Sequence, residues 1–499
     1  MATFIFLRRC IAFLAAVFSL STGISAQQWE ITANLQQGRH WHQAAVLSDG
    51  RILIVGGITG SSAFVDGMSM DGMSTSSCEI FNPLTGEVTP AASMNVARSE
   101  FPIVTMPDGH VYVFGGLSGE SQRGTCTDLI ERYDAENDRW EIVGRMTSTR
   151  RRHAAVQIDG HRVLICGGAR QDRITYGDSE LFDVSNGQTV PTGPMPANMK
   201  EGEMALLEGN LPVYIGGRQG GPNSPRQEDL FVFNAQANVW YTREQPAGMP
   251  AIVSGTVVGP ALVICGGNLS EVPYTFSRGV YAVEDGMVRH VVDVDKGRSL
   301  HALTPLGERT VLVSGGSTED YGTLASSFAI GVEGGQILIK PDHVISRGYH
   351  KLLRYEHPTL GLTFYAISGM TNVRTPAVDD GTDMPTRPGY DDGRNNPELT
   401  PTIEMLSVYS EAMLLQTSST TAEFAPATAA YPNPMSSLLT IDAPHGASIT
   451  LTDVLGHIVA TTTALDRQAI LDVQDLPAGA YLAIIRTANH SITHAIVKR

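Results

Sequence analysis

Four pairs of arginine and histidine in this sequence share the spacing Arg-x-x-His. The pairs are Arg39/His42, Arg150/His153, Arg298/His301 and Arg347/His350. A guanidinium group binds carboxylates in a bidentate manner, and several imidazoles around one point can hold a metal ion. The shared spacing therefore raises two hypotheses, an anion-binding site and a metal centre.

Two further stretches, VLICGG at 163–168 and LVICGG at 262–267, place Cys166 and Cys265 before a pair of glycines. A zinc site needs about four ligands, and each stretch offers one. Other copies of the same pattern carry other residues at this position, namely Val55, Phe114, Ile215, Ser314 and Ser368. A position that accepts mostly apolar residues predicts core packing for the two cysteines.

The pattern behind these stretches is an apolar run followed by two glycines, and it recurs along the chain. The first glycine of each copy falls at 56, 115, 167, 216, 266 and 315, with a weaker seventh copy at Gly369. An aromatic strand and a turn rich in Asn, Asp and Gly follow the glycines, which is typical of hairpins. A period near 50 residues predicts repeated four-stranded units, as in the blades of a propeller.

These residues resemble the kelch family, in which a double glycine closes the second strand and an aromatic residue and a tryptophan follow. Tyr133 and Trp140 take these places in the second copy. The resemblance covers 29–412 and implies an all-β fold, a seven-bladed kelch-type β-propeller over 27–412. The stretch WEITANL at 29–35 is expected to complete the seventh blade, so that the ring has no open edge.

The first strands of a propeller line its axis, so the Arg-x-x-His residues are expected to meet at one mouth of the channel. The second blade has Arg98 and Phe101 at this place, and the fourth has Lys200 and Glu203. The predicted ligand-binding residues are Arg39, His42, Arg98, Arg150, His153, Lys200, Glu203, Arg298, His301, Arg347, Tyr349 and His350. The alternative, that these residues are only part of the repeat's own pattern, stays open.

An enzymatic function is the alternative to binding. Gly348-Tyr349-His350 is similar to the Tyr-His pair of galactose-oxidase-like copper enzymes, which are kelch propellers. That chemistry also needs a cysteine cross-linked to a tyrosine near the axis, whereas Cys166 and Cys265 belong to second strands. No nucleophile–base pair or carboxylate dyad with a catalytic spacing is found. Binding of a glycan or protein is therefore favoured, with no cofactor, over an epimerase-like or copper-oxidase enzyme.

Two long loops, at 58–77 and 371–400, follow the double glycines of the first and seventh blades, which ring closure makes neighbours. Loops of this length are usually functional or disordered. The second loop offers oxygen ligands for calcium, though without EF-hand spacing, at Asp379, Asp380, Asp383, Asp391, Asp392 and Asn395. Cys78 and Cys126 lie after the glycines of adjacent blades and are a candidate disulfide, with two free thiols as the alternative.

The two ends of the chain carry export signals. Residues 1–26 have the basic start and apolar run of a signal peptide, and 413–430 have a linker composition. Residues 431–499 resemble the type A C-terminal sorting domain of the type IX secretion system, on the motif residues Tyr431, Pro432, Asn433, Pro434, Gly456, Gly479 and Tyr481. The resemblance implies a small Ig-like β-sandwich that engages the type IX secretion machinery, with an unrelated Ig-like domain as the alternative.

The charge of the chain limits its partners. The formal net charge is −16, and removal of Arg8 and Arg9 with the signal peptide makes it −18. Such acidity argues against nucleic-acid binding, which needs a basic surface. No later apolar run reaches the roughly 18 residues of a transmembrane helix. The sequence therefore predicts a protein that is secreted or held at the outer cell surface, where it binds an extracellular glycan or protein.

Overall fold

The structure is a computed structural model that describes residues 28–408 and 430–498 apart from short gaps. The gaps fall at 61–63, 66–67, 70–71, 121–123, 172–173, 208–210, 220–228, 245–253, 272–273, 285–286, 319–321, 373–396, 432–437, 443–446, 454–457, 466–467, 478 and 487–490. The predicted signal peptide therefore lies outside the described residues, as does 413–429 of the predicted linker. The chain divides into two compact units, one of Met1–Gly335 and Ile339–Tyr409, the other of Ser410–Arg499 with the short stretch Gln336–Leu338.

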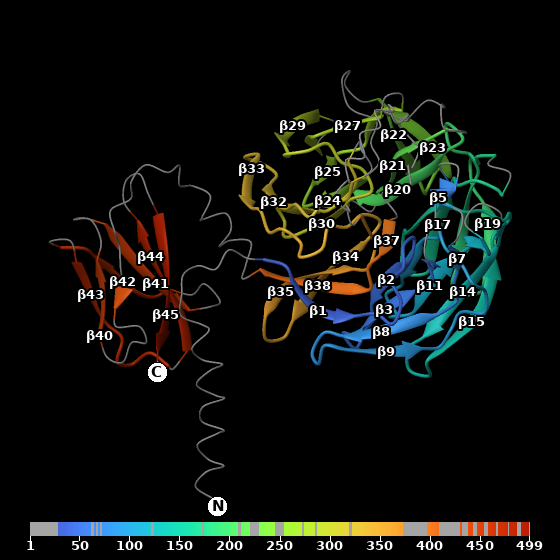
Figure 1. The fold of residues 1–499 in the computed structure, drawn as a ribbon. Helices are drawn as coiled ribbons and strands as arrows, with labels where there is room; N and C mark the ends of the chain where they lie inside the picture. Colours follow the sequence, from blue (N-terminus) through green and yellow to red (C-terminus); the bar gives the residue numbers. More distant parts are fainter. Residues whose placement is uncertain are drawn as a thin grey trace, which may run out of the picture. The chain divides into compact units, whose positions relative to one another are not determined.

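Within its described residues, the first unit contains seven four-stranded antiparallel sheets, which Figure 1 shows arranged in a ring as the blades of a β-propeller. Blade 1 contains β2 (Gln43–Val46), β3 (Ile52–Val55), β8 (Cys78–Asn82) and β9 (Glu87–Ala91). Blade 2 contains β10 (Ile103–Thr105), β11 (Val111–Phe114), β14 (Leu129–Asp134) and β15 (Arg139–Arg145). Blade 3 contains β16 (Ala154–Gln157), β17 (Arg162–Cys166), β18 (Ser179–Asp183) and β19 (Gln188–Pro191).

The remaining blades repeat this order. Blade 4 contains β20 (Lys200–Leu207), β21 (Leu211–Arg218), β22 (Leu230–Asn234) and β23 (Val239–Arg243). Blade 5 contains β24 (Ser254–Val258), β25 (Ala261–Cys265), β28 (Gly279–Glu284) and β29 (Met287–Asp293). Blade 6 contains β30 (Ala302–Pro305), β31 (Thr310–Ser314), β32 (Ser327–Gly331) and β33 (Gln336–Ile339). Blade 7 contains β34 (Lys351–His357), β35 (Gly361–Ile367), β38 (Thr402–Val408) and β1 (Glu30–Asn34).

The second strand of each blade is apolar because neighbouring blades cover both of its faces. Every residue of Ile52–Val55 in β3 is fully buried, and Cys166 and Cys265 are buried free thiols at the ends of β17 and β25. The glycines that follow have positive φ angles, such as 57° at Gly56 and 95° at Gly57. Glycine adopts this left-handed backbone at no steric cost, which lets the strand end abruptly beside the next blade.

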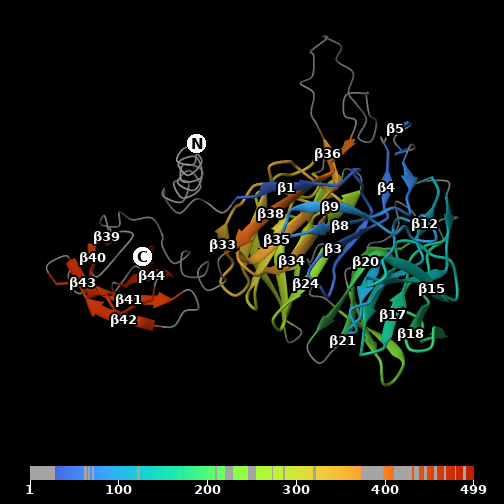
Figure 2. The same ribbon diagram turned by 90° about the horizontal axis from the view of Figure 1, so that it is seen from below.

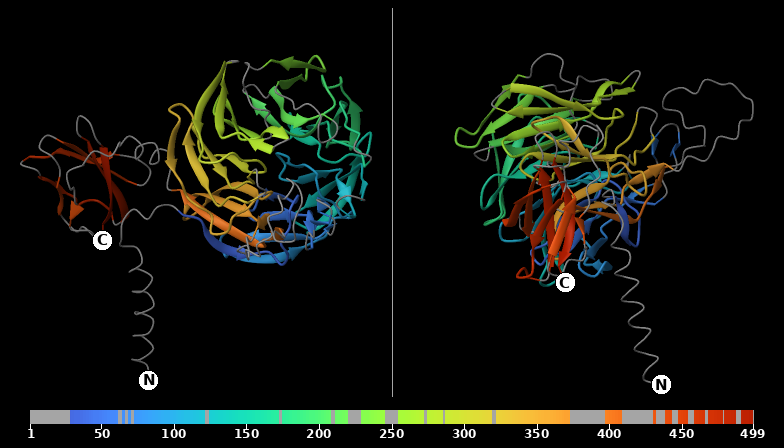
Figure 3. Two further views of the ribbon diagram at one scale, coloured as in Figure 1. Left: turned by 45° about the horizontal axis from the view of Figure 1, so that its top comes forward. Right: turned by 90° about the vertical axis from the view of Figure 1, so that its left-hand side faces the viewer.

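The ring closes where the two ends of the propeller meet. The first strands contact one another in the cyclic order β2, β10, β16, β20, β24, β30, β34 and back to β2. Strand β1 pairs with β38, for example Glu30 with Met405, and so is the outer strand of blade 7 (Figure 3). Trp29 lies just before β1, is buried, and donates from Nε1 to Ser327 Oγ of blade 6 at 2.8 Å. The start of the propeller thus holds blades 6 and 7 together.

Short hairpins extend the ring on the side where the second strands end. They are β4 (Ile58–Thr59) with β7 (Met73–Ser74), β5 (Phe64–Val65) with β6 (Met68–Ser69), β12 (Leu117–Ser118) with β13 (Thr125–Cys126), β26 (Asn268–Glu271) with β27 (Tyr274–Phe276), and β36 (Met370–Asn372) with β37 (Pro397–Leu399). Figure 2 shows β4, β5 and β36 projecting from the same side of the ring. The described hairpins at the bases of the two long loops therefore lie on one face.

The second unit has two sheets that share one core. One sheet has the order β39 (Ala430–Tyr431), β40 (Leu438–Asp442) and β43 (Gln468–Asp472). The other has the order β42 (Ile458–Thr463), β41 (Ser448–Asp453), β44 (Gly479–Arg486) and β45 (Ser491–Lys498). Ile441 and Leu471 of the first sheet pack in the same cluster as Ile449 and Ile485 of the second. No helix in the described part of the chain is long and apolar enough to cross a membrane.

Candidate functional site

The turn before each first strand is held by the preceding blade. The N–H of the second glycine donates to the backbone carbonyl of the residue that begins the next blade's Arg-x-x-His segment. Gly57 donates to Arg98 at 2.9 Å, Gly116 to Arg150 at 2.9 Å and Gly316 to Arg347 at 2.8 Å. Gly369 donates to Arg39 at 3.0 Å, which repeats the contact across the closure of the ring. These bonds bring the Arg-x-x-His segments to one end of the axis.

The arginine side chains of these segments turn into their own blades. Arg39 donates from Nη1 to the Gly56 carbonyl at 2.9 Å and pairs with Glu79 through Nη2 at 2.6 Å. Arg98, Arg150, Arg298 and Arg347 donate in the same way to a backbone carbonyl at the end of the second strand. All five are at most 1% exposed. Burial therefore keeps these guanidinium groups from a ligand at the mouth, and the sequence interpretation of them as ligand-binding residues is corrected to a structural role.

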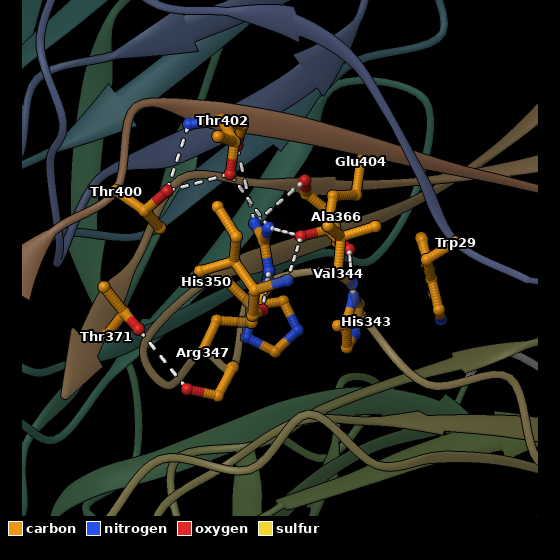
Figure 4. Close-up of polar contacts among 12 residues, drawn as sticks. Trp29, His343, Val344, Arg347, His350, Ala366, Thr371, Thr400, Thr402 and Glu404 are labelled. Atoms are coloured by element: carbon orange, nitrogen blue, oxygen red, sulfur yellow. Dashed lines mark hydrogen bonds and ion pairs between the residues drawn. The ribbon is translucent and has the colours of Figure 1, made fainter. Parts of the chain in front are cut away.

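Blade 7 shows how completely such an arginine is satisfied (Figure 4). Arg347 pairs with Glu404 and donates from Nη2 to Thr402 Oγ1 at 3.0 Å. Glu404 also accepts from the backbone N–H of Val344 at 2.9 Å and from His343 Nδ1 at 3.0 Å. Burial alone would raise the pKa of Glu404, but His343 and Arg347 lower it to about 2. Trp29 stacks on His343 with ring centroids 4.2 Å apart, so this network is part of the ring closure.

Two predicted alignments are shifted by one residue. In blade 4 it is Met199, not Lys200, whose carbonyl accepts from the second glycine, Gly168, at 2.7 Å. In blade 7 it is Ser368 that stands in the place of the first glycine, with a φ of 52°. Its hydroxyl accepts from Arg39 N at 2.9 Å and donates to Thr400 O at 2.7 Å, which compensates for the strained backbone. Pattern matching missed both because a methionine and a serine replace the residues that mark the repeat.

The four histidines lie between blades, where burial makes them neutral. His42, His153, His301 and His350 are at most 7% exposed. Desolvation lowers the pKa of His301 to about 3, with a further contribution from Arg298. His350 Nε2 lies 2.9 Å from Ser314 Oγ of the preceding blade. Among the described residues, no group of three or more His, Cys, Asp and Glu side chains has an arrangement that could hold a metal ion.

The second of the two residues between arginine and histidine, rather than the arginine or the histidine, faces the mouth. It has a left-handed backbone in each blade described there, with φ between 52° and 62°, at Trp41, Glu100, Arg152, Glu201, Leu300 and Tyr349. We call these six residues the mouth ring. Their backbones are linked in series, since Glu201 N donates to Arg152 O at 3.0 Å and Arg152 N donates to Glu100 O at 2.8 Å. Tyr349 N likewise donates to Leu300 O at 3.0 Å.

A chain of alternating charges crosses one half of the mouth ring. Arg151 pairs with Glu100 at 3.1 Å, Glu100 pairs with Arg152 at 2.8 Å, and Arg152 pairs with Glu201. Arg218 ends the chain by pairing with Glu201 at 2.6 Å. Burial alone would raise the pKa of Glu201, but Arg152 and Arg218 lower it to about 2. Both carboxylates are therefore ionised, and each is shared by two arginines.

The other half of the mouth ring is aromatic. Trp41 and Tyr349 have ring centroids 4.9 Å apart, and the Arg152 guanidinium lies 5.0 Å from the Trp41 centroid. Desolvation raises the pKa of Tyr349 to about 12, so its hydroxyl stays protonated and can donate a hydrogen bond. Of the residues that the sequence predicts for ligand binding, Tyr349 is in the mouth ring and Lys200 directly adjoins it. Desolvation lowers the pKa of Lys200 to about 8.

The remaining predicted sites fall elsewhere. Cys78 and Cys126 are not joined by a disulfide, and the candidate disulfide is therefore wrong in this structure. Cys78 packs in the core between blades 1 and 2, whereas Cys126 Sγ faces Ala169 O of blade 3 at 3.9 Å. The calcium candidates Asp379, Asp380, Asp383, Asp391 and Asp392 lie outside the described residues, as do Pro432, Asn433, Pro434 and Gly456 of the sorting motif. Tyr431 lies in β39, Gly479 begins β44, and Tyr481 donates to Pro477 O at 2.7 Å.

Comparisons with known proteins agree with both units. The family model of the kelch motif matches residues 42–95 and 104–147, and that of the secretion system C-terminal sorting domain matches 429–499. Alpha-scruin of Limulus polyphemus is 24% identical over 228 residues, which is 44% of this chain and 25% of that protein. Kelch-like protein 23 of Mus musculus is 35% identical over 96 residues, which is 19% of this chain and 17% of that protein.

The matched part of this chain thus spans no more than a quarter of the length of these two relatives. Among solved structures, "Structure of YjhT" aligns over 61% of this chain and 98% of that one, with 14% identity and a TM-score of 0.47. The kelch matches cover the first two blades, where the double glycines, the aromatic third strands and Trp140 are all present.

Proposed function

Because the chain is a kelch-type β-propeller that ends in a secretion system C-terminal sorting domain, we propose that it is an exported binding module whose ligand docks on the mouth ring. The sorting domain indicates export to the extracellular space or the cell surface by the type IX machinery. Kelch repeats in turn suggest a protein-binding module. The mouth ring and the class of ligand are the parts of this function that we infer from the site.

The observation that supports this proposal most strongly is the left-handed backbone of six non-glycine residues at one position of the fold. Such a backbone costs about 1 kcal/mol or more per residue in place of glycine, and it tends to occur at functional sites. In four of these six blades the position is bracketed by the same arginine and histidine, whereas the mouth ring carries Trp, Glu, Arg, Glu, Leu and Tyr. Side chains that vary on a constant frame favour recognition over structural support.

The charge of the site favours a ligand that carries carboxylates. Four cationic side chains, Arg151, Arg152, Arg218 and Lys200, lie around Glu100 and Glu201 in a chain of net −16. A local positive field in an acidic protein attracts anions selectively. Trp41 and Tyr349 add an aromatic surface that can pack on the apolar part of the same ligand. Acidic glycans and acidic protein segments both have these features.

The bases of the two long loops lie beside this surface. His40 forms an isolated β-bridge with Ile58 at the base of the first loop, and Gly348 forms one with Met370 at the base of the second. Both loops therefore start at the two blades that supply Trp41 and Tyr349. A ligand on the mouth ring would meet the loop bases first, which supports the mouth as the recognition face.

The test is a screen of the mature chain against a glycan array and a library of acidic peptides, repeated with Trp41→Ala. We expect the hits to be carboxylate-bearing, and their binding to fall by about tenfold or more in the variant, as for a buried aromatic anchor. Tyr241→Ala is the matched control, because Tyr241 is an exposed aromatic residue on the outer strand β23. Arg298 and Arg347 are unsuitable targets, since their buried side chains hold blades 6 and 7.

Hits that bind Trp41→Ala and wild type equally would overturn the mouth as the docking site. Hits on the glycan array alone or the peptide library alone would identify the ligand class. A mature chain that binds neither carboxylate-bearing glycans nor acidic peptides would overturn the proposal that it recognises them.

A further inference from the structure

The propeller axis carries a second pair of charges, two residues further along the chain than the mouth ring. Glu203 of blade 4 and Lys351 of blade 7 both lie in first strands, opposite the residue that precedes the double-glycine position. Their partners in the register are Ile215 and Ile367. We call this position of the seven blades the axial layer.

The rest of the axial layer carries no charge. Gln43, Ala154, Ser254 and Ala302 occupy it by the same register rule, and Gln43 donates from its amide to Phe101 O. Blades 4 and 7 are separated by two blades on one side of the ring and three on the other. Glu203 and Lys351 therefore face each other across the axis instead of belonging to neighbouring strands.

Both side chains are reached by solvent and yet surrounded by protein. Glu203 is exposed and Lys351 is half-buried. Desolvation nevertheless raises the pKa of Glu203, against the opposing effects of the Gly255 N–H and Lys351. Desolvation likewise lowers the pKa of Lys351, against the opposing effect of Glu203. Solvent therefore reaches both groups, while the surrounding strands reduce the hydration that their charged forms would have in water.

The two charges act on each other without touching. Among the described residues, Glu203 accepts from Gly255 N at 3.2 Å, and neither Glu203 nor Lys351 forms an ion pair. A lone charge in a partly desolvated place is unfavourable until an opposite charge or a hydrogen-bonding group meets it. An anion alone would compensate Lys351 but would be repelled by Glu203, and a cation alone would have the reverse problem.

We propose that Glu203 and Lys351 form a binding site, separate from the mouth ring, for a small zwitterion such as a free α-amino acid. The ligand's carboxylate accepts from Lys351 Nζ, and its ammonium group donates to Glu203. The alanines and Gln43 leave the rest of the layer small and uncharged, which gives room for an uncharged side group. The site does not depend on the binding function of the mouth ring.

Calorimetry on the full mature chain tests this site with leucine, with 4-methylpentanoate, which lacks the ammonium group, with isoamylamine, which lacks the carboxylate, and with glucose. We expect leucine to bind at least about tenfold more tightly than either singly charged analogue, since each lost charge removes a charge-assisted contact. Glu203→Gln and Lys351→Met should each weaken leucine binding by about tenfold to about a hundredfold.

Arg354→Met is the matched control, because Arg354 lies on the same strand as Lys351 but pairs with Glu356 at the exposed end. A second measurement covers the case in which a variant fails to fold. The chain has five lysines, so the side-chain ¹³C resonance of Lys351 can be followed by NMR in the wild type, and leucine should shift it alone. No binding of leucine, equal binding of the singly charged analogues, or an unshifted Lys351 resonance would each overturn the proposal.

Discussion

Blades 3 and 4 are neighbours with the same strand order, yet they fill the space beside the double glycine with different chemistry. In blade 3 Arg150 donates to Gly167 O at 2.9 Å and pairs with Asp178 at 2.8 Å and Glu180 at 3.2 Å. In blade 4 the equivalent positions carry Met199 and Phe231, which pack with Tyr214 in one buried cluster. Met199 and Tyr214 are both fully buried.

This difference indicates that the fold needs side chains that fill the space beside the double glycine, rather than side chains that are charged. A buried ion pair and a well-packed apolar set of similar size can be equally stabilising, provided that both members change together. Blade 4 also replaces the inter-blade histidine by Gly202, whose N–H donates to the Tyr214 hydroxyl at 3.0 Å. The residues at this position therefore match one another within each blade. Combining the ionic residues of blade 3 with the apolar residues of blade 4 in one blade is expected to destabilise the fold.

The largest effect is expected from removing the cation of the buried ion pair in blade 3. Arg150→Met leaves Glu180 buried without its cation and should lower the free energy of unfolding by about 3–5 kcal/mol. Urea denaturation of the propeller, followed by tryptophan fluorescence, measures it. Adding Glu180→Phe should recover most of the loss, and a double variant as unstable as the single one would show that the charge itself is required.

The converse substitution introduces a charge into the apolar cluster of blade 4. Met199→Arg places a guanidinium beside Tyr214 and Phe231, where blade 4 has no carboxylate corresponding to Glu180, and should cost about 3 kcal/mol or more. The same denaturation experiment applies. Stability equal to that of the wild type would mean that water reaches this position. Blade 4 would then not require apolar residues beside its double glycine.

Acidification should separate blade 3, which has the inter-blade histidine, from blade 4, which does not. Desolvation, with Arg150 and Arg98, lowers the pKa of His153 well below its usual value. As the pH falls through about 6.5, the unfolded chain takes up a proton that the folded chain does not, so stability falls. The loss between pH 7 and pH 5 should be about 1–2 kcal/mol per buried histidine.

The matched experiment compares wild type with His153→Gln, which removes the titrating group. The variant should have a flatter dependence of stability on pH over this range. An identical pH profile would mean that His153 is protonated or solvated in the folded state.

The smallest effect concerns the contact between Arg150 and the ring of Tyr176. Tyr176 lies with its ring centroid 4.9 Å from the Arg150 guanidinium, an arrangement without an equivalent at Met199. Tyr176→Leu keeps the apolar volume and should cost about 0.5–1 kcal/mol. Thermal unfolding at several salt concentrations checks this, and a larger loss would mean that Tyr176 supports the loop more than the arginine.

The sequence predicts the architecture because the residues that mark it are few and repeated. Double glycines such as Gly56-Gly57 give the phase, and the apolar run before each one identifies a strand covered on both faces. The phase is lost where a blade departs from the pattern, as at Met199 and Ser368. The repeat itself cannot distinguish a clamp from a ligand site, since Arg347 serves the fold through contacts with Thr402 and Glu404 that are distant in sequence.

The mouth ring could not be predicted for the opposite reason. Its six residues share a backbone conformation but no side-chain type, so no motif links Trp41 with Glu100 or Arg152. Only the hydrogen bonds between successive blades bring them together. Lys351 was not predicted as a site residue for a similar reason. Its charge indicates a site only in combination with that of Glu203, which lies three blades away along the sequence.

The central claim is that the variable mouth ring, and not the repeated arginines, recognises the ligand. The most direct measurement is the affinity, by surface plasmon resonance, of a screened carboxylate-bearing ligand for Arg152→Gln and for Arg132→Gln. Arg152 is the hub of the mouth ring, whereas Arg132 pairs with Glu141 on the outer side of blade 2 at 2.6 Å. We expect an affinity about tenfold or more lower for Arg152→Gln and unchanged for Arg132→Gln; equal affinities for both variants would show that the mouth ring does not recognise this ligand.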